Sequence, residues 1–135
     1  MNIKSGIKIF NMADLIYKDE SYAIVGVCIE VHKVLGKGFS ENVYKDAIEY
    51  EFIKRDIPYK REKQCDVHYK DVVLKHKFYS DFVVYDKIIL EVKCAEKIID
   101  GYKKQTLNYM SITGYKLGII ANFGEDSFVQ KRVVL

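Results

Sequence analysis

The 135-residue chain has no tryptophan, a single proline (Pro58) and only three cysteines. The cysteines, Cys28, Cys65 and Cys94, are odd in number and far apart, and no C-x-x-C pair is present. This pattern argues against a zinc ribbon and against a four-cysteine iron–sulfur site within one chain. It predicts a reducing compartment, and we expect a cytoplasmic protein.

Long hydrophobic runs are also missing, as is a charged-then-apolar leader, so we expect neither a membrane span nor a signal peptide. The net charge is only +3, which permits nucleic-acid binding but does not demonstrate it, because a modest excess of lysine usually forms a solvated surface. The length predicts one domain with one core. We place this domain at residues 12–135, after a loose N-terminal tail at residues 1–11, with Met12 as an alternative start.

Three charged residues interrupt two apolar, strand-like runs near the middle of the chain. Asp81 lies in the first run, and Glu91 and Lys93 lie in the second. Charges in such runs are costly to bury, so each needs a partner, a metal ion or water. Glu91 and Lys93 are two residues apart and therefore point to the same face of a strand, whereas Val92 points to the other.

The turn between these runs decides whether Asp81 joins that face. A three-residue turn at 85–87 pairs Val84 with Ile88 and sets Asp81 opposite Glu91, whereas one residue of slip would move Asp81 to the far face. Such turns usually need one residue in the left-handed region, which Asp86 tolerates well. The sequence therefore predicts a carboxylate pair with an adjacent lysine on one face of a sheet.

Two helices are expected before this hairpin. Apolar spacing predicts the first from Ser21, as a cap, to Leu35, and the second at 41–55, capped by Ser40. His32 lies at the edge of the first apolar stripe, where a partly buried histidine with a local partner is favoured over a role near a site. Glu41 lies in the first turn of the second helix, where acids are common and favoured by the helix dipole.

The remaining elements predict an α/β fold. Strands at 59–69, 77–84 and 88–93 form an antiparallel meander, and a helix at 98–113 precedes a strand at 116–122 and a terminal strand at 128–135. The strand–helix–strand step favours a parallel crossover. The expected result is a mixed β-sheet flanked by helices.

One polar residue stands within the apolar stripe of the helix at 98–113. The stripe consists of Ile98, Tyr102, Gln105, Tyr109 and Ile112. If this face packs toward the sheet, Gln105 must be hydrogen-bonded there. The alternative is an edge residue that reaches solvent.

Taken together, these residues resemble the PD-(D/E)xK nuclease superfamily. The resemblance rests on Asp81 followed by Glu91-Val92-Lys93, with a helical Glu41 before them and Gln105 after them. Segment 38–44 (GFSENVY) resembles the signature of the GxxExxY protein family within it. Similarity to that family extends from about residue 14 to the end and includes segments 29–36 (IEVHKVLG), 107–109 (LNY) and 120–124 (IANFG).

The chain departs from the family pattern at two positions. Ser80 stands before Asp81, where the superfamily name has proline. Many relatives also lack this proline. Tyr102 occupies the place, three residues before Gln105, where the family often has a histidine. A proton-transfer role for a histidine at that place therefore does not carry over.

The resemblance implies a restriction-endonuclease-like core and a metal-dependent phosphodiesterase site. Asp81 and Glu91 would hold Mg²⁺ or Mn²⁺, ions that oxygen ligands suit, and the Val92 carbonyl would be a further ligand. Glu41 would face the metal from the helix terminus. Lys93 would orient or deprotonate the attacking water, and Gln105 would hold a substrate phosphate or a water.

Three readings of this set stand side by side. The first is an Mg²⁺-dependent endonuclease, with DNA favoured over RNA as substrate. The second is a catalytically silent nuclease-fold protein that binds nucleic acid or a protein partner. The third is a structural cluster in which Lys93 neutralises an acid. Three costly charges kept together favour the first reading.

Nothing in the sequence reads bases, because neither a zinc finger nor a helix-turn-helix is recognisable. A lone minimal domain suggests low sequence specificity, a homodimer that spans both strands, or a partner protein that targets it. Basic residues offer candidate phosphate contacts, although each is more often plain surface. They are Lys60, Arg61, Lys63, Lys97, Lys103 and Lys104.

Overall fold

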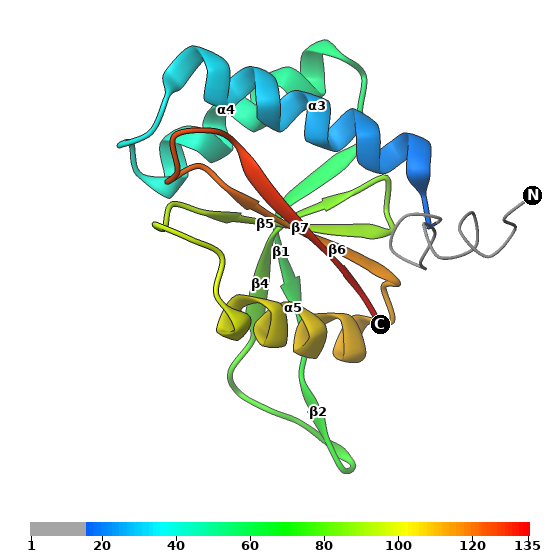
Figure 1. Ribbon diagram of the computed structural model, residues 1–135. Helices are drawn as coiled ribbons and strands as arrows, with labels where there is room; N and C mark the ends of the chain where they lie inside the picture. Colours follow the sequence, from blue (N-terminus) through cyan, green and yellow to red (C-terminus); the bar gives the residue numbers. More distant parts are fainter. Residues whose placement is uncertain (1–15) are drawn as a thin grey trace, which may run out of the picture.

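The computed structural model describes residues 16–135, so the predicted tail at 1–11 and Met12 lie outside the described residues. The described part consists of two helices, five strands, a third helix and two further strands, in that order (Figure 1). Its elements are α3 (Lys18–Leu35), α4 (Glu41–Lys54), β1 (Tyr59–Cys65), β2 (His68–Tyr69), β3 (Val72–Val73), β4 (Phe78–Val84), β5 (Ile88–Lys93), α5 (Asp100–Thr113), β6 (Leu117–Asn122) and β7 (Val129–Val134).

Five strands form one mixed sheet in the order β1-β4-β5-β6-β7. The first three pair antiparallel, as the predicted meander requires, and α5 carries the chain across to β6, which runs parallel to β5. The last strand, β7, returns antiparallel to β6. Helices α3 and α4 cover one face of the sheet and α5 covers the other (Figure 1). The predicted mixed sheet flanked by helices is thus confirmed.

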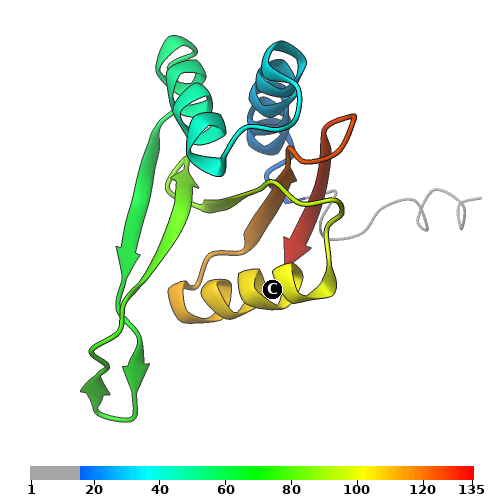
Figure 2. The ribbon, with the colours of Figure 1, turned by 90° about the vertical axis from the view of Figure 1, so that its left-hand side faces the viewer.

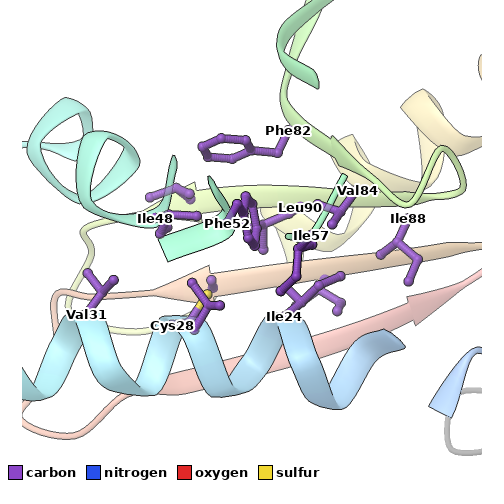
Figure 3. Close-up of a cluster of buried hydrophobic side chains, with 14 of the residues drawn as sticks. Ile24, Cys28, Val31, Ile48, Phe52, Ile57, Phe82, Val84, Ile88 and Leu90 are labelled. Atoms are coloured by element: carbon purple, nitrogen blue, oxygen red, sulfur yellow. The ribbon is translucent and has the colours of Figure 1, made fainter. Parts of the chain in front are cut away.

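The larger core lies between the sheet and the α3–α4 pair. Ile24, Cys28 and Val31 of α3 and Ile48 and Phe52 of α4 point toward the strands (Figure 3). A smaller core, on the α5 side, is made by Ile89, Met110, Ile120 and Val133. Because helices cover both faces, the central strands are apolar along almost their whole length, and every residue of β6 is buried.

Two expectations about element boundaries are wrong. Helix α3 begins at Lys18, and Ser21 lies buried inside it, where its hydroxyl donates a hydrogen bond to the Lys18 carbonyl at 3.0 Å. The strand predicted at 59–69 is divided, because β1 ends at Cys65 and β2 pairs with β3 in a separate two-stranded hairpin. This hairpin projects away from the sheet (Figure 2). Its two-residue turn is made by Lys70, which has a left-handed φ of 54°, and Asp71.

A buried amide anchors the loop that follows β5. Asn122, fully buried at the end of β6, accepts a hydrogen bond from the Ala95 N–H and donates one to the Ala95 carbonyl, each at 2.9 Å. Gly124 packs against the same residue so closely that a Cβ there would lie 2.4 Å from the Ala95 carbonyl oxygen. Asn122 and Gly124 therefore fix the chain just beyond Lys93.

We expect Asn122→Ala to lower the free energy of unfolding by about 2–4 kcal/mol, because it leaves the partly buried Ala95 N–H and carbonyl without these partners and opens space where Asn122 is fully buried. Urea unfolding followed by circular dichroism would measure this loss. Asn108→Ala, on the exposed side of α5, is the matched control and should change stability by less than about 0.5 kcal/mol. Equal losses in the two variants would contradict the role assigned to Asn122.

Candidate active site

The hairpin of β4 and β5 brings Asp81 and Glu91 to neighbouring positions. Val84 pairs with Ile88 and Phe82 pairs with Leu90, so the predicted three-residue turn and its register are confirmed. The same register, continued by one residue, sets Asp81 opposite Glu91. The turn uses two left-handed residues where one was expected, Tyr85 at φ 55° and Asp86 at φ 58°.

Each carboxylate oxygen of Asp81 has a partner. Oδ2 accepts a hydrogen bond from the backbone N–H of Val92 at 2.7 Å, across the two strands. Oδ1 accepts one from the Lys45 ammonium at 3.0 Å. The side chain of Asp81 is 18% exposed, so it lies near the surface of the protein rather than deep in the core.

Glu91 is in the opposite situation. Its side chain is almost fully buried, and its Oε1 has no hydrogen-bond partner. The pKa of the Glu91 carboxyl is raised to about 9, mainly by burial and secondly by the negative charge of Asp81. The positive charge of Lys93 lowers this pKa but does not outweigh them. A buried carboxylate oxygen without a donor, next to a second carboxylate, is the kind of oxygen site that a divalent cation fits.

The residue that sequence reasoning missed is Lys45. It lies in α4, and its side chain is only 6% exposed. Its ammonium forms ion pairs with Asp81 and with Glu62 of β1. Burial alone would lower the pKa of Lys45, but the hydrogen bonds that its ammonium donates to Glu62 and Asp81 outweigh it, and the pKa is raised. The signal was present in the sequence, because Lys45 shares helical spacing with the buried Ile48 and Phe52.

Lys93 shares the site without pairing with either acid. Its ammonium lies 4.7 Å from the centre of the Tyr102 ring, a cation–π contact with the first turns of α5. Within residues 16–135, no ion pair joins Lys93 to Asp81 or Glu91. The reading in which Lys93 neutralises an acid therefore has no support here, since Lys45 makes that contact.

Glu41 and Gln105 are the two residues from distant parts of the sequence that we expected to support the site. Glu41 is the first residue of α4 and is exposed. The pKa of the Cys94 thiol is raised to about 11, mainly because the thiol is partly buried and secondly because the negative charge of Glu41 is near. Across residues 16–135, no three acidic, histidine or cysteine side chains gather closely enough to hold a metal ion. Glu41 thus lies near the end of β5 without joining Asp81 and Glu91 in one cluster.

Gln105 is exposed, and its amide donates a hydrogen bond to the Tyr109 hydroxyl at 3.0 Å. Tyr109 in turn stacks on Phe78 at the start of β4, with ring centres 4.2 Å apart. The buried face of α5 is instead made by Thr106 and Met110. Gln105 is therefore the edge residue of the two alternatives, and the stripe that contains it is turned by about one position from the packed face.

The other sequence candidates have mainly structural contacts. The Arg61 guanidinium pairs with Asp46 and Glu49, and Lys63 donates a hydrogen bond to the Tyr115 hydroxyl. His32 is buried, as expected, but its Nε2 contacts the Glu125 carbonyl at 2.9 Å, a distant partner rather than a local one. The basic residues that remain exposed are Lys60, Lys97 and Lys104.

Comparison with known proteins identifies the family of this chain. A family model of the PD-(D/E)XK nuclease superfamily matches residues 18–133, and the chain belongs to this superfamily. That membership supports a nuclease-type function. No curated protein sequence matches the chain. Within residues 16–135, none of the helices has the length and apolar character needed to cross a membrane.

A solved structure shares the fold. The crystal structure of SSO0001 has a TM-score of 0.56 and 16% identity, and the alignment covers 90% of this chain and 58% of that one. This chain therefore spans little more than half the length of SSO0001. LHK-Exo, an alkaline exonuclease from Laribacter hongkongensis, has a TM-score of 0.47 and 13% identity over 84% of this chain and 81% of its own.

Proposed function

We propose that this protein is a metal-dependent nuclease that hydrolyses phosphodiester bonds in nucleic acid, with DNA favoured over RNA. The observation that carries the proposal is the buried, unpartnered Oε1 of Glu91, held beside Asp81 by the register of β4 and β5. Keeping a carboxylate in this position costs folding free energy, and a cation-dependent reaction gives a reason for the cost.

The oxygen donors at this place fit Mg²⁺ or Mn²⁺. Asp81 and Glu91 would hold the ion, with the Val92 carbonyl as a further ligand, and Glu41 would approach from the start of α4. When bound, the ion would offset negative charge on the phosphate and on the attacking oxygen.

The protein side chains would do the remaining work. Lys93, on the same strand as Glu91 and supported by the Tyr102 ring, would orient the attacking water or accept its proton, and its charge would stabilise the phosphate in the transition state. Gln105 is accessible at the edge of α5 and would hold a substrate phosphate or a water.

We further propose that the chain belongs to the GxxExxY family. The motif tyrosine has a clear structural role, because the Tyr44 hydroxyl donates a hydrogen bond to the Gly36 carbonyl at 2.5 Å and accepts one from the Phe39 N–H at 3.4 Å. These bonds tie the α3–α4 turn to α4 and so fix where the helix begins, at Glu41. The motif thereby joins a glutamate at a helix terminus to the tyrosine that holds the terminus in place.

Substrate selection would come from outside the site described here. We propose that the protein cuts with low sequence specificity, pairs with a second copy to reach both strands, or is directed by a partner protein. A cytoplasmic location agrees with the free thiols of Cys28, Cys65 and Cys94.

A nuclease-fold protein that binds nucleic acid or a protein without cutting is the second candidate. The Lys45 contact favours it, because an ammonium already occupies Oδ1 of Asp81. A silent protein would keep this ion pair permanently and would not respond to divalent cations.

A cleavage assay separates the two candidates. Purified protein would be incubated with single-stranded, double-stranded and branched DNA and RNA, in Mg²⁺, in Mn²⁺ or in a chelator. We expect products with metal only, and none with Glu91→Ala, which also excludes a contaminating nuclease. Glu96→Ala, at an exposed position, is the matched control and should cut like the wild type. Binding without products on every substrate would favour the silent protein.

A further inference from the structure

We propose that Lys45 is a built-in counterion of the metal site, which Asp81 and Glu62 share in the metal-free protein and which stays with Glu62 alone when a divalent cation binds Asp81 and Glu91. This inference rests on the proposed function, because it concerns the same two carboxylates. It assigns Lys45 and Glu62 as positioning residues, which act through Asp81 and not on the substrate.

The first support is the placement of Lys45 between two acids. Its ammonium lies 3.0 Å from Oδ1 of Asp81 and also pairs with Oε1 of Glu62, so the two carboxylates share one cation. Lys45 is almost completely buried, and a buried lysine requires charge partners. Loss of either acid would leave the other as its main partner.

The second support is the backbone of Glu62. The pairs Arg61–Phe82 and Lys63–Ser80 place Glu62 directly opposite Asp81 in the β1–β4 ladder. At this position, in the middle of β1, Glu62 has a left-handed φ of 53°. Such a conformation is costly for a residue other than glycine, and it often marks a functional place. Here it accompanies a side chain that reaches Lys45.

The third support is the difference in exposure between the two acids. The Glu62 side chain is 49% exposed, whereas that of Asp81 is 18% exposed. Glu62 therefore stays partly hydrated and can keep Lys45 at little cost when Asp81 no longer shares it. Asp81 and the buried Glu91 would be left as the pair that faces an incoming cation.

The electrostatic consequence has a definite sign. An ammonium and a divalent cation that share one carboxylate repel each other strongly at such short range. Lys45 should therefore weaken metal binding, and Glu62 should strengthen it by drawing Lys45 away. Opposite effects of two residues in contact distinguish this device from a purely structural ion pair.

The test is the affinity of the full chain for Mn²⁺, measured by isothermal titration calorimetry on the wild type, Lys45→Met, Glu62→Gln and the double variant. We expect Lys45→Met to bind Mn²⁺ about tenfold more tightly and Glu62→Gln about tenfold more weakly. In the Lys45→Met background, Glu62→Gln should have almost no further effect, because Glu62 acts through Lys45. Lys37→Met changes the net charge equally, removes a surface pair with Asp126 and should bind like the wild type.

Three results would overturn the inference: unchanged or weaker binding by Lys45→Met, unchanged binding by Glu62→Gln, or additive effects in the double variant. If Lys45→Met does not fold, as judged by circular dichroism, Glu62→Gln at its half-exposed position still decides between a loss of affinity and none. If the wild type binds Mn²⁺ and cuts while these variants bind alike, only the Lys45 inference fails. If no variant binds Mn²⁺, the proposed metal site fails with it.

Discussion

Replacing Lys93 with alanine should lower the rate of phosphodiester cleavage about 10³-fold, the usual size of the contribution of a group that transfers a proton or stabilises charge at the reacting atoms. Lys93 follows Glu91 on the same face of β5, and its ammonium contacts no carboxylate among residues 16–135. Its charge is thus available to a phosphate and a water at the two acids. Single-turnover cleavage of labelled DNA in Mg²⁺ would measure the loss.

The control for this variant is Lys33→Ala, which removes the same charge from an exposed position in α3. It should reduce the rate by less than about threefold, the effect of one weak surface charge. Lys93→Ala should bind Mn²⁺ as tightly as the wild type, or more tightly, since Lys93 is not proposed as a ligand. Full cleavage by Lys93→Ala would contradict the role given to this residue.

Replacing Glu91 with glutamine should raise the stability of the metal-free protein by about 4–5 kcal/mol at pH 8. Burial and the Asp81 charge raise the pKa of Glu91 to about 9 in the folded protein, above its ordinary value of 4.5. Between these two values the folded state binds a proton that the unfolded state has released. Wild-type stability should therefore fall as the pH rises from about 5 to 9, and glutamine should remove this part of the pH dependence.

Urea unfolding in a chelator at several pH values would measure this effect. Glu96→Gln, at an exposed position, is the matched control and should leave the pH profile of the wild type unchanged. Saturating Mn²⁺ should reverse the order of stability, because a bound cation stabilises the protein that keeps both carboxylates. A wild type that gains stability between pH 5 and 9 in the chelator would contradict the environment described for Glu91.

The hairpin could be predicted because its information is local. The turn length and the alternation of two short strands determine the register of Asp81 and Glu91, and neither depends on distant packing. The parallel crossover also followed from element order, because a strand–helix–strand step has few alternatives. The fold class was predictable for the same reason.

The parts that could not be predicted depend on contacts between distant segments. Lys45 meets Asp81 and Glu62 only after α4 packs on the sheet, and an amphipathic pattern shows that a face is buried but not which polar groups lie under it. For α5, the aromatic side chains suggested a stripe through Gln105, but the packed face runs through Thr106 and Met110. This shift of one position around the helix leaves the Gln105 amide exposed instead of buried.

The central claim is that Asp81 and Glu91 hold a divalent cation at the place where cleavage occurs. Diffraction from crystals soaked in Mn²⁺, with data collected to reveal anomalous scattering, tests it most directly. We predict a manganese peak between the two carboxylates, with the Lys45 ammonium moved from Asp81 toward Glu62. Crystals with no peak at this position, in protein that still cuts DNA in Mn²⁺, would contradict the claim.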